Sequence, residues 1–185
     1  INEDMMGTAE NLARLYKVTR QDADEFALSS QMKAKDAREK GRLAKEITPV
    51  VLKTRRGDVV VSEDEHPRPE ATLETLSRLH AVKPGGIQTA GNSSGIVDGG
   101  SALIMATEKK AKELGIEPIG ELLSWGTAAV DPHFMGIGPV PASLIALARA
   151  GMTFKDLDFI EINEAFAGQY LAVERELKLD RSRVN

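Results

Sequence analysis

Apolar residues recur every three or four positions in several stretches of the chain, the spacing expected of helices that bury one face. The longest of these stretches begins at Thr19, where Asp22 completes an acidic variant of the capping box, and Gly41 marks its end. Shorter stretches of the same kind predict helices over residues 8–16, 72–79, 107–115, 141–151 and 166–177.

A hairpin is predicted before the chain reaches its midpoint. Residues 47–53 are apolar and β-branched, and the interruption by Pro49 favours an edge strand. Gly57-Asp58 is predicted to turn the chain into a second short strand over residues 59–61.

Strand, helix, strand and helix alternate in the last third of the chain. Predicted strands over 119–130 and 157–162 flank the helix over 141–151, and the helix over 166–177 follows them. This order indicates an α/β fold with a parallel strand pair and a right-handed crossover. Because one such unit leaves strand edges unpaired, we expect the chain to be part of a larger protein.

Composition and charge exclude several classes of protein. The chain has 185 residues, of which 42% are hydrophobic, enough to bury a core. Its formal net charge of -4 argues against a nucleic-acid partner, which favours basic surfaces. No apolar run reaches membrane-spanning length, and the first residues do not form a secretory signal, so a cytoplasmic location is expected.

The chain contains no cysteine. This excludes disulfides, thiolate zinc sites and a cysteine nucleophile supplied by the chain itself. The three histidines, His66, His80 and His133, lack metal-ligand spacing, so surface or loop roles and no metal site are predicted. Asp131 is expected to shape the turn before His133.

Two features permit more than one interpretation. Residues 85–100 hold six glycines, which favours either tight packing or a binding loop, and they lack the Gly-Lys-Ser/Thr ending of a phosphate loop. Asn163 stands between a predicted strand and a predicted helix. Its side chain can cap the helix, or it can aim its amide at a substrate or a water.

Five short motifs resemble those of the thiolase family in their order and spacing, over essentially the whole chain. They are Met-Met-Gly-Thr-Ala-Glu-Asn at 5–11, Thr-Ala-Gly-Asn-Ser-Ser-Gly at 89–95, Asp-Gly at 98–99, Met-Gly-Ile-Gly-Pro-Val-Pro-Ala at 135–142 and Asn-Glu-Ala-Phe-Ala at 163–167. Each motif is weakly specific alone, whereas the five in register are strongly specific.

The resemblance implies a thiolase-like fold, a layered α-β-α-β-α arrangement, of which this chain would hold the middle portion. Thiolases cleave a 3-ketoacyl-CoA with free CoA, or condense acetyl-CoA in reverse, with CoA and acyl-CoA as substrates and no cofactor. The family's nucleophilic cysteine, its acid/base cysteine and its Gly-His-Pro histidine have no counterpart in this sequence. The chain alone is therefore expected to be inactive.

The same resemblance divides the chain into three parts. Residues 1–89 would form a CoA-binding loop domain, and residues 90–117 the last strand and helix of the N-terminal thiolase half. Residues 118–185 would form the first β-α-β-α part of the C-terminal half. The full-length protein is expected to be a homo-oligomer, a dimer or a tetramer.

The resemblance also assigns roles to individual residues. Asn163 matches the asparagine that holds a water in an oxyanion hole, where a neutral donor stabilises charge on the thioester oxygen. Arg68 matches a position at the nucleotide end of CoA, and Ala90 and Ser94 match small residues along the pantetheine tunnel. Further positions near the pantetheine or acyl group are Met6, Thr75, Met135, Ala165 and Phe166.

Departures from the family pattern bear on the substrate. Met5 stands where acetoacetyl-forming members often have a histidine, which favours fatty-acid degradation by β-oxidation. Val82 replaces an aromatic residue of many members, which affects the contacts to the CoA adenine. The alternatives are a non-catalytic CoA-binding or structural subunit of a multi-chain complex, and a β-ketoacyl synthase. The Asn-Glu-Ala-Phe-Ala motif and the loop domain argue against the synthase.

Overall fold

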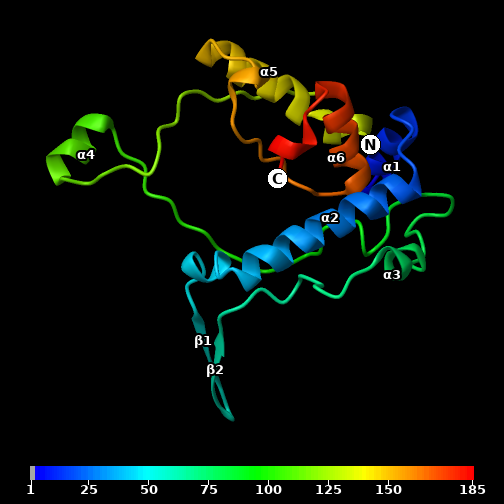
Figure 1. Cartoon of the computed structure of the whole chain (residues 1–185), viewed down its shortest axis with the longest axis horizontal. Helices are drawn as coiled ribbons and strands as arrows, with labels where there is room; N and C mark the ends of the chain where they lie inside the picture. Colours follow the sequence, from blue (N-terminus) through cyan, green and yellow to red (C-terminus); the bar gives the residue numbers. More distant parts are fainter. Residues whose placement is uncertain (1–2) are drawn as a thin grey trace.

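Helices from opposite ends of the sequence meet in the core. The structure, a computed structural model, describes residues 3–185, so the first two residues of the predicted loop domain lie outside the described residues. Helix α6 (Ala167–Leu177) packs on both α1 (Met5–Leu15) and α2 (Arg20–Glu39), as Figure 1 shows. Phe26 of α2 stacks on Tyr170 of α6 with ring centroids 4.1 Å apart.

The remaining helices are short, and three of them lie where the sequence predicts helices over 72–79, 107–115 and 141–151. Their bounds are Leu73–Ser77 (α3), Glu108–Leu114 (α4) and Pro139–Ala150 (α5), with 3-10 helices at Leu43–Lys45 (η1), Pro132–Ile137 (η2), Phe154–Asp156 (η3) and Arg181–Arg183 (η4). Within residues 3–185, no helix is both long enough and apolar enough to cross a membrane.

Local capping chemistry sets the helix boundaries. At the start of α2, the Thr19 hydroxyl accepts a hydrogen bond from the Asp22 amide at 3.1 Å, and the Asp22 carboxylate accepts one from the Thr19 amide at 2.9 Å. This confirms the predicted capping box. Gly115 and Gly151 end α4 and α5 with φ angles of 63° and 67°, a conformation that glycine adopts without strain.

The predicted hairpin is present, but its turn lies earlier than expected. Strand β1 (Val50–Thr54) pairs antiparallel with β2 (Gly57–Val61), and Thr54 is opposite Gly57. The turn is therefore Arg55-Arg56, and the prediction of a turn beginning at Gly57 is wrong. The Thr54 hydroxyl fixes the position of the turn. It accepts a hydrogen bond from the Arg56 amide at 3.1 Å and donates one to the Gly57 carbonyl at 2.8 Å, and these bonds close a two-residue loop.

The two strands predicted in the last third of the chain are absent from the described residues. Residues 119–130 have no strand hydrogen bonds, and residues 157–162 form one isolated parallel bridge, between Ile160 and Val184. The prediction of a parallel pair with a crossover is therefore wrong for residues 3–185, whose sheet consists of β1 and β2. A strand requires a hydrogen-bonding neighbour along its length. Val184 provides one only at Ile160, and residues 119–130 lie beside helix α5, which offers no strand edge.

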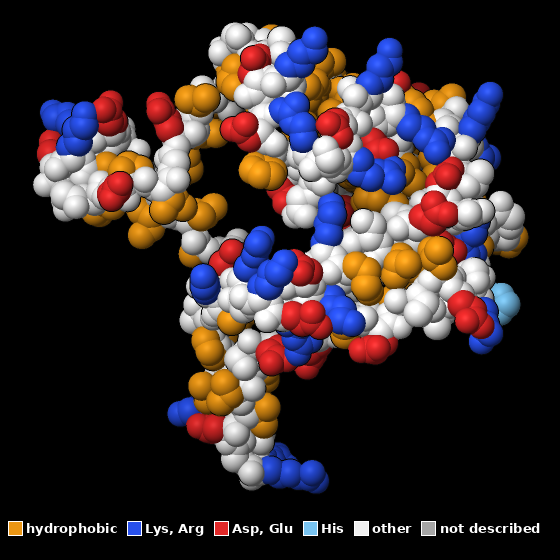
Figure 2. Space-filling view, viewed as in Figure 1, with side chains coloured by type: hydrophobic (Ala, Val, Ile, Leu, Met, Phe, Trp, Pro, Cys, Tyr) orange, Lys and Arg blue, Asp and Glu red, His pale blue; other side chains and the backbone are white. Residues whose placement is uncertain are grey.

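Apolar side chains stay uncovered where these strands were expected. Ile119, Trp125 and Phe159 are exposed, and so is Ile104 in the strand expected within residues 90–117. That strand is also missing, and α4 is the regular element that remains there. Figure 2 shows hydrophobic side chains on the surface along the segments that lead to α4 and along the hairpin.

Candidate functional site

A buried carboxylate holds the glycine-rich segment against α1. Glu10 is 3% exposed and accepts hydrogen bonds from the amides of Ile87 and Gln88, each at 2.8 Å. Gly86 permits this approach because a Cβ there would lie 2.3 Å from Glu10 Oε1. Tight packing, one of the two interpretations of this segment, is confirmed at Gly86.

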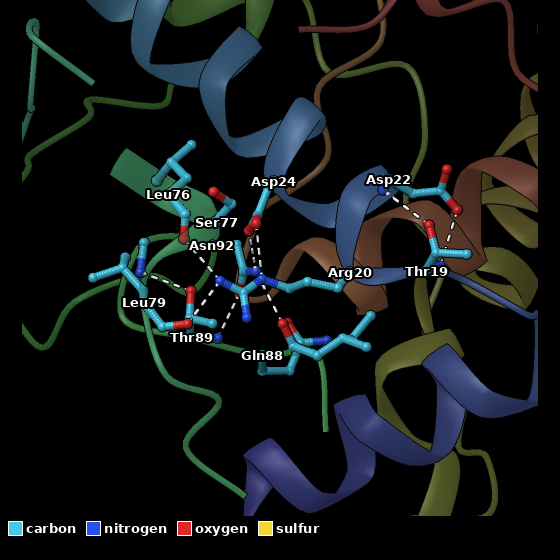
Figure 3. A network of polar contacts seen from close by, with 12 residues as sticks. Thr19, Arg20, Asp22, Asp24, Leu76, Ser77, Leu79, Gln88, Thr89 and Asn92 are labelled. Carbon is cyan, nitrogen blue, oxygen red and sulfur yellow. Dashed lines mark hydrogen bonds and ion pairs between the residues drawn. The ribbon is translucent and has the colours of Figure 1, made fainter. Parts of the chain in front are cut away.

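A buried polar network fixes the same segment to α2, as Figure 3 shows. Asn92 donates from Nδ2 to Asp24 Oδ1 at 2.9 Å, and Asp24 Oδ2 accepts from Arg20 Nε at 2.8 Å. Asn92 Oδ1 accepts from the Thr89 amide at 2.7 Å. These bonds define the path of the Thr-Ala-Gly-Asn motif along the helix.

The Thr-Ala-Gly-Asn motif then runs antiparallel beside the Asn-Glu-Ala-Phe-Ala motif. The Ser94 amide donates to the Ala165 carbonyl at 3.0 Å, and the Ala167 amide donates to the Asn92 carbonyl at 2.9 Å. Two motifs that are distant in the sequence are thus joined through their backbones at the start of α6.

Helix η2 brings the Met-Gly-Ile-Gly-Pro motif onto α1 and α6. Asp131 begins it by accepting from the His133 amide at 2.9 Å, which confirms the turn-shaping role predicted for Asp131. A Cβ at Gly136 would lie 2.5 Å from Gln169 Cγ and 2.8 Å from Leu12 Cδ1. The Gln169 amide donates to the Gly136 carbonyl at 3.2 Å. Glycine is therefore required for η2 to lie directly on the two core helices.

Residues from three of the five motifs line one cavity of about 190 Å³. Its wall consists of Met5, Thr8, Ala9, Met135, Gly136, Pro139, Asn163, Ala165, Phe166 and Gln169. This wall is apolar apart from one hydroxyl and two side-chain amides, and none of its residues is ionisable. Such a wall suits a narrow, largely apolar group that has one polar end.

Asn163 does not cap the helix that follows it. Helix α6 begins at Ala167, and its N-cap residue, Phe166, makes no side-chain capping bond. The capping interpretation of Asn163 is therefore wrong. The Asn163 residue is exposed at the cavity wall, and within residues 3–185 its side chain has no hydrogen-bond partner. Its amide is available to a ligand or a water.

The structure brings several of the predicted site residues together. Met135, Ala165 and Phe166 line the cavity with Asn163, although they come from two separate motifs. Met6 is partly buried on α1 and does not line the cavity, whereas the neighbouring Met5 does. The structure thus gathers these side chains, and their roles toward CoA stay predictions.

Other predicted CoA-binding residues lie outside the cavity wall. The Arg68 guanidinium folds back onto the carbonyls of residues 65–67, the nearest of them at 2.7 Å. The Thr75 hydroxyl takes part in the capping box of α3. Ala90 and Ser94 are exposed on the loop that reaches the Asn-Glu-Ala-Phe-Ala motif. Their CoA contacts also stay predictions.

Half of the wall was not singled out from the sequence. Thr8, Ala9, Gly136 and Pro139 belong to the quoted motifs, so the motifs located them without indicating which side chains face the cavity. Gln169 lies beyond the last motif. Helical spacing could have identified it, because Gln169 lies three residues after Phe166 in the predicted helix and positions three or four residues apart share one face.

Charged groups near the cavity lie at the start of α1. His133 Nδ1 lies 2.9 Å from Glu3 Oε2, and this hydrogen bond lowers the pKa of Glu3. Asp4 lies 2.9 Å from Lys83 Nζ, which lowers the pKa of Asp4. The three histidines are exposed, as predicted. Within the described residues, no group of three or more metal-ligating side chains could hold a metal ion.

A larger cavity of about 350 Å³ lies beside the second half of α2. Its lining residues are Ala34, Arg38, Leu43, Ala44, Ile47, Pro49, Ser62, Glu63, Asp64 and Pro67. Arg38 is ion-paired with Glu63, and no residue of the five motifs reaches this cavity. It is therefore separate from the candidate site.

Two family models match the sequence and together cover most of it. Residues 1–109 match the thiolase N-terminal domain, and residues 116–185 match the thiolase C-terminal domain. An acetyl-CoA acetyltransferase of Rhizobium meliloti is 50% identical over 179 residues, which are 96% of this chain and 46% of that protein. The chain thus spans about half the length of the curated relatives it matches.

Solved structures follow the same backbone path. The acetyl-CoA acetyltransferase of Bacillus anthracis has a TM-score of 0.97 at 48% identity, covering 100% of this chain and 48% of that one. Human mitochondrial 3-ketoacyl-CoA thiolase in complex with CoA has a TM-score of 0.91 at 44% identity, covering 97% and 45%. These likenesses confirm the expected thiolase-like α/β fold, including the segments that lack strand hydrogen bonds here.

Proposed function

The chain belongs to the thiolase family, and on that premise we propose that it forms the coenzyme A and acyl side of a thiolase site. The reaction is acyl transfer, either thiolytic cleavage of a 3-ketoacyl-CoA or the reverse condensation of acetyl-CoA. The observation that carries the proposal is the cavity, where three motifs distant in sequence meet around Asn163.

Asn163 is the proposed donor to the substrate thioester. Negative charge grows on the thioester oxygen as an enolate or a tetrahedral species forms, and an amide at the cavity wall can donate to it directly or through a water. A preorganised donor of this kind lowers the barrier by roughly 3 kcal/mol. Because an amide does not titrate, its strength is the same at every working pH.

The cavity wall supplies binding and charge stabilisation rather than acid-base chemistry. None of its residues is ionisable, and the chain has no cysteine. The family resemblance assigns the nucleophile and the acid/base groups to two cysteines and a histidine that match no residue of this chain. In the proposed ping-pong mechanism, the C2–C3 bond of the substrate breaks, the nucleophilic cysteine takes the shortened acyl group as acetyl-CoA leaves, and free CoA then accepts that acyl group.

Degradation of a 3-ketoacyl-CoA, as in β-oxidation, is the direction we propose. Met5 lines the cavity at the position where acetoacetyl-forming thiolases often have a histidine. A flexible thioether there extends the apolar wall and suits an acyl chain better than a charged ring would. The presence of CoA in the human mitochondrial 3-ketoacyl-CoA thiolase structure supports CoA as the ligand.

The absence of cysteine favours a second candidate function, a non-catalytic CoA-binding or structural subunit. The coding sequence on both sides of this segment discriminates the two. A cysteine-containing half upstream and a Gly-His-Pro segment downstream in the same frame support the enzyme, and stop codons on both sides support the subunit.

Titration calorimetry with CoA tests the proposed site. We expect the chain to bind CoA, and we expect Ala165→Trp, which fills the cavity, to weaken binding about tenfold or more. Ala106→Trp places the same side chain on an exposed segment outside the cavity and is the matched control. Absence of CoA binding, or equal binding by both variants, would contradict the proposal.

We also propose a cytoplasmic location and a homo-oligomeric state, a dimer or a tetramer, for the full-length protein. Cell fractionation with an antibody to this chain tests the first. Light scattering of the full-length gene product tests the second, and a monomer at micromolar concentration would contradict it.

A further inference from the structure

The Asn92 side chain is fully used in hydrogen bonds. Asn92 is 4% exposed, and its Nδ2 donates to Asp24 Oδ1 at 2.9 Å and to the Ile87 carbonyl at 3.0 Å. Its Oδ1 accepts from the Thr89 amide at 2.7 Å. An aspartate of the same shape has no donor for the first two bonds, so this position requires an amide.

The network continues from Asp24 to a third element. Asp24 is 3% exposed and is paired with Arg20, whose Nη2 donates to the carbonyls of Leu76 and Leu79 at 2.7 and 2.8 Å. These carbonyls lie near the C-terminal end of α3, and Figure 3 shows the guanidinium between them and Asp24. The loop that carries Asn92 is therefore held by a buried, charge-assisted network.

The backbone of the same residue holds the start of α6. The Ala167 amide is one of the unpaired donors of the first helical turn, and it donates to the Asn92 carbonyl at 2.9 Å. The N-cap residue makes no side-chain capping bond of its own. The Ser94 amide donates to the Ala165 carbonyl at 3.0 Å, so both bonds lie within a few residues of Asn163.

We infer that Asn92 is a positioning residue for Asn163, and this rests on the proposed function of Asn163 as the donor at the cavity. The side chain of Asn92 fixes the loop to α2, and its backbone fixes the segment that carries Asn163. Loss of the side chain therefore releases the Asn163 segment while the contacts of α1, α2 and α6 in the core remain.

Amide hydrogen exchange followed by NMR tests this inference without any ligand. In Asn92→Ala, the amides of Ser94 and Ala167 are expected to exchange about tenfold faster, beyond any change at the core amide of Val173, because local opening becomes easier. Thr19→Ala removes the side-chain cap of the same helix α2 without removing a hydrogen bond of Asn92, Asp24 or Arg20, and it is the matched control. Exchange that accelerates equally at all three amides in both variants would assign Asn92 a merely structural role and overturn the inference.

A charge swap provides the rescue experiment. Asn92→Asp places a carboxylate against Asp24 and is expected to shift the side-chain amide resonances of Asn163. Adding Asp24→Asn restores a donor between the two side chains, so the resonances are expected to return partway toward the wild type. The return is partial because the Ile87 carbonyl still lacks its donor. A double variant that resembles Asn92→Asp would overturn the inference.

Binding of CoA separates this inference from the proposed function. If the wild-type chain binds CoA, Asn92→Ala is expected to weaken binding about tenfold while Thr19→Ala leaves it unchanged. Equal affinity of Asn92→Ala and the wild type would overturn the positioning role. If the wild-type chain does not bind CoA, the proposed function fails, and the exchange measurement alone decides whether Asn92 positions Asn163.

Discussion

Gly136 has no side chain, and this allows η2 to pack directly against α1 and α6 at the cavity. A Cβ at this position would lie 2.5 Å from Gln169 Cγ and 2.8 Å from Leu12 Cδ1. We therefore expect Gly136→Ala to lower the free energy of unfolding by about 1–3 kcal/mol, the usual effect of overpacking. Urea unfolding followed by circular dichroism measures this change.

The control for Gly136→Ala is Gly120→Ala, because a Cβ at Gly120 would meet nothing within 4 Å. We expect that variant to change the free energy of unfolding by no more than about 0.5 kcal/mol. Equal losses in the two variants would contradict the packing account of Gly136.

Asp22 links two parts of the core and makes stability depend on pH. The Thr19 amide and, after it, the Arg175 guanidinium at 2.9 Å lower the pKa of Asp22 below its ordinary value of 3.8. A lowered folded-state pKa means that the carboxylate stabilises the fold above 3.8, and that this contribution disappears as pH falls through the lower, folded value.

The variant Asp22→Asn tests this pH dependence. Because the side chain is 37% exposed and screened by solvent, we expect the variant to be less stable than the wild type by about 0.5–1 kcal/mol at neutral pH. The difference is expected to shrink as pH falls below 3.8. Urea unfolding of both proteins at neutral and acidic pH measures it, and a difference that stays constant would contradict the role of Asp22.

At the scale of elements, the sequence predicts helices better than strands because helix signals are local. The capping box at Thr19 and the glycines after α4 and α5 satisfy backbone groups within a few residues, and each of these predictions is confirmed. A strand depends on a partner that is distant in the sequence. Residues 119–130 have a strand-like composition, but they lie beside helix α5, which offers no strand edge to pair with.

Hydrogen exchange of the isolated chain tests this account of the strands. The amides of residues 119–130 are expected to exchange close to the rate of an unfolded chain, because they make no strand hydrogen bonds. The amides of Leu171 and Val173 in buried α6 are the internal reference and are expected to be strongly protected. Strong protection across residues 119–130 would show that they pair after all.

At the scale of the whole molecule, the site depends on contacts that no single motif specifies. The motifs predicted Met135, Asn163, Ala165 and Phe166 as site residues, and the packing of η2 on α1 and α6 brings them to one cavity. Met5 rather than Met6 lines the cavity because of how α1 is rotated about its axis, and spacing in the sequence does not determine that rotation. The wall of the cavity is therefore a property of the fold, and its lack of ionisable residues agrees with the proposed division of roles, in which other residues supply the reactive groups.

This division of roles leads to a prediction for the chain as a whole. With no cysteine anywhere and no ionisable residue at the cavity wall, the purified chain is expected to bind CoA without turning over acetoacetyl-CoA. Loss of the enolate absorbance of acetoacetyl-CoA in the presence of CoA measures turnover. A contaminating thiolase depends on its cysteine and is inhibited by iodoacetamide, whereas activity of this chain would resist the reagent. Turnover that persists after iodoacetamide would therefore assign the chemistry to this chain and overturn the proposed roles.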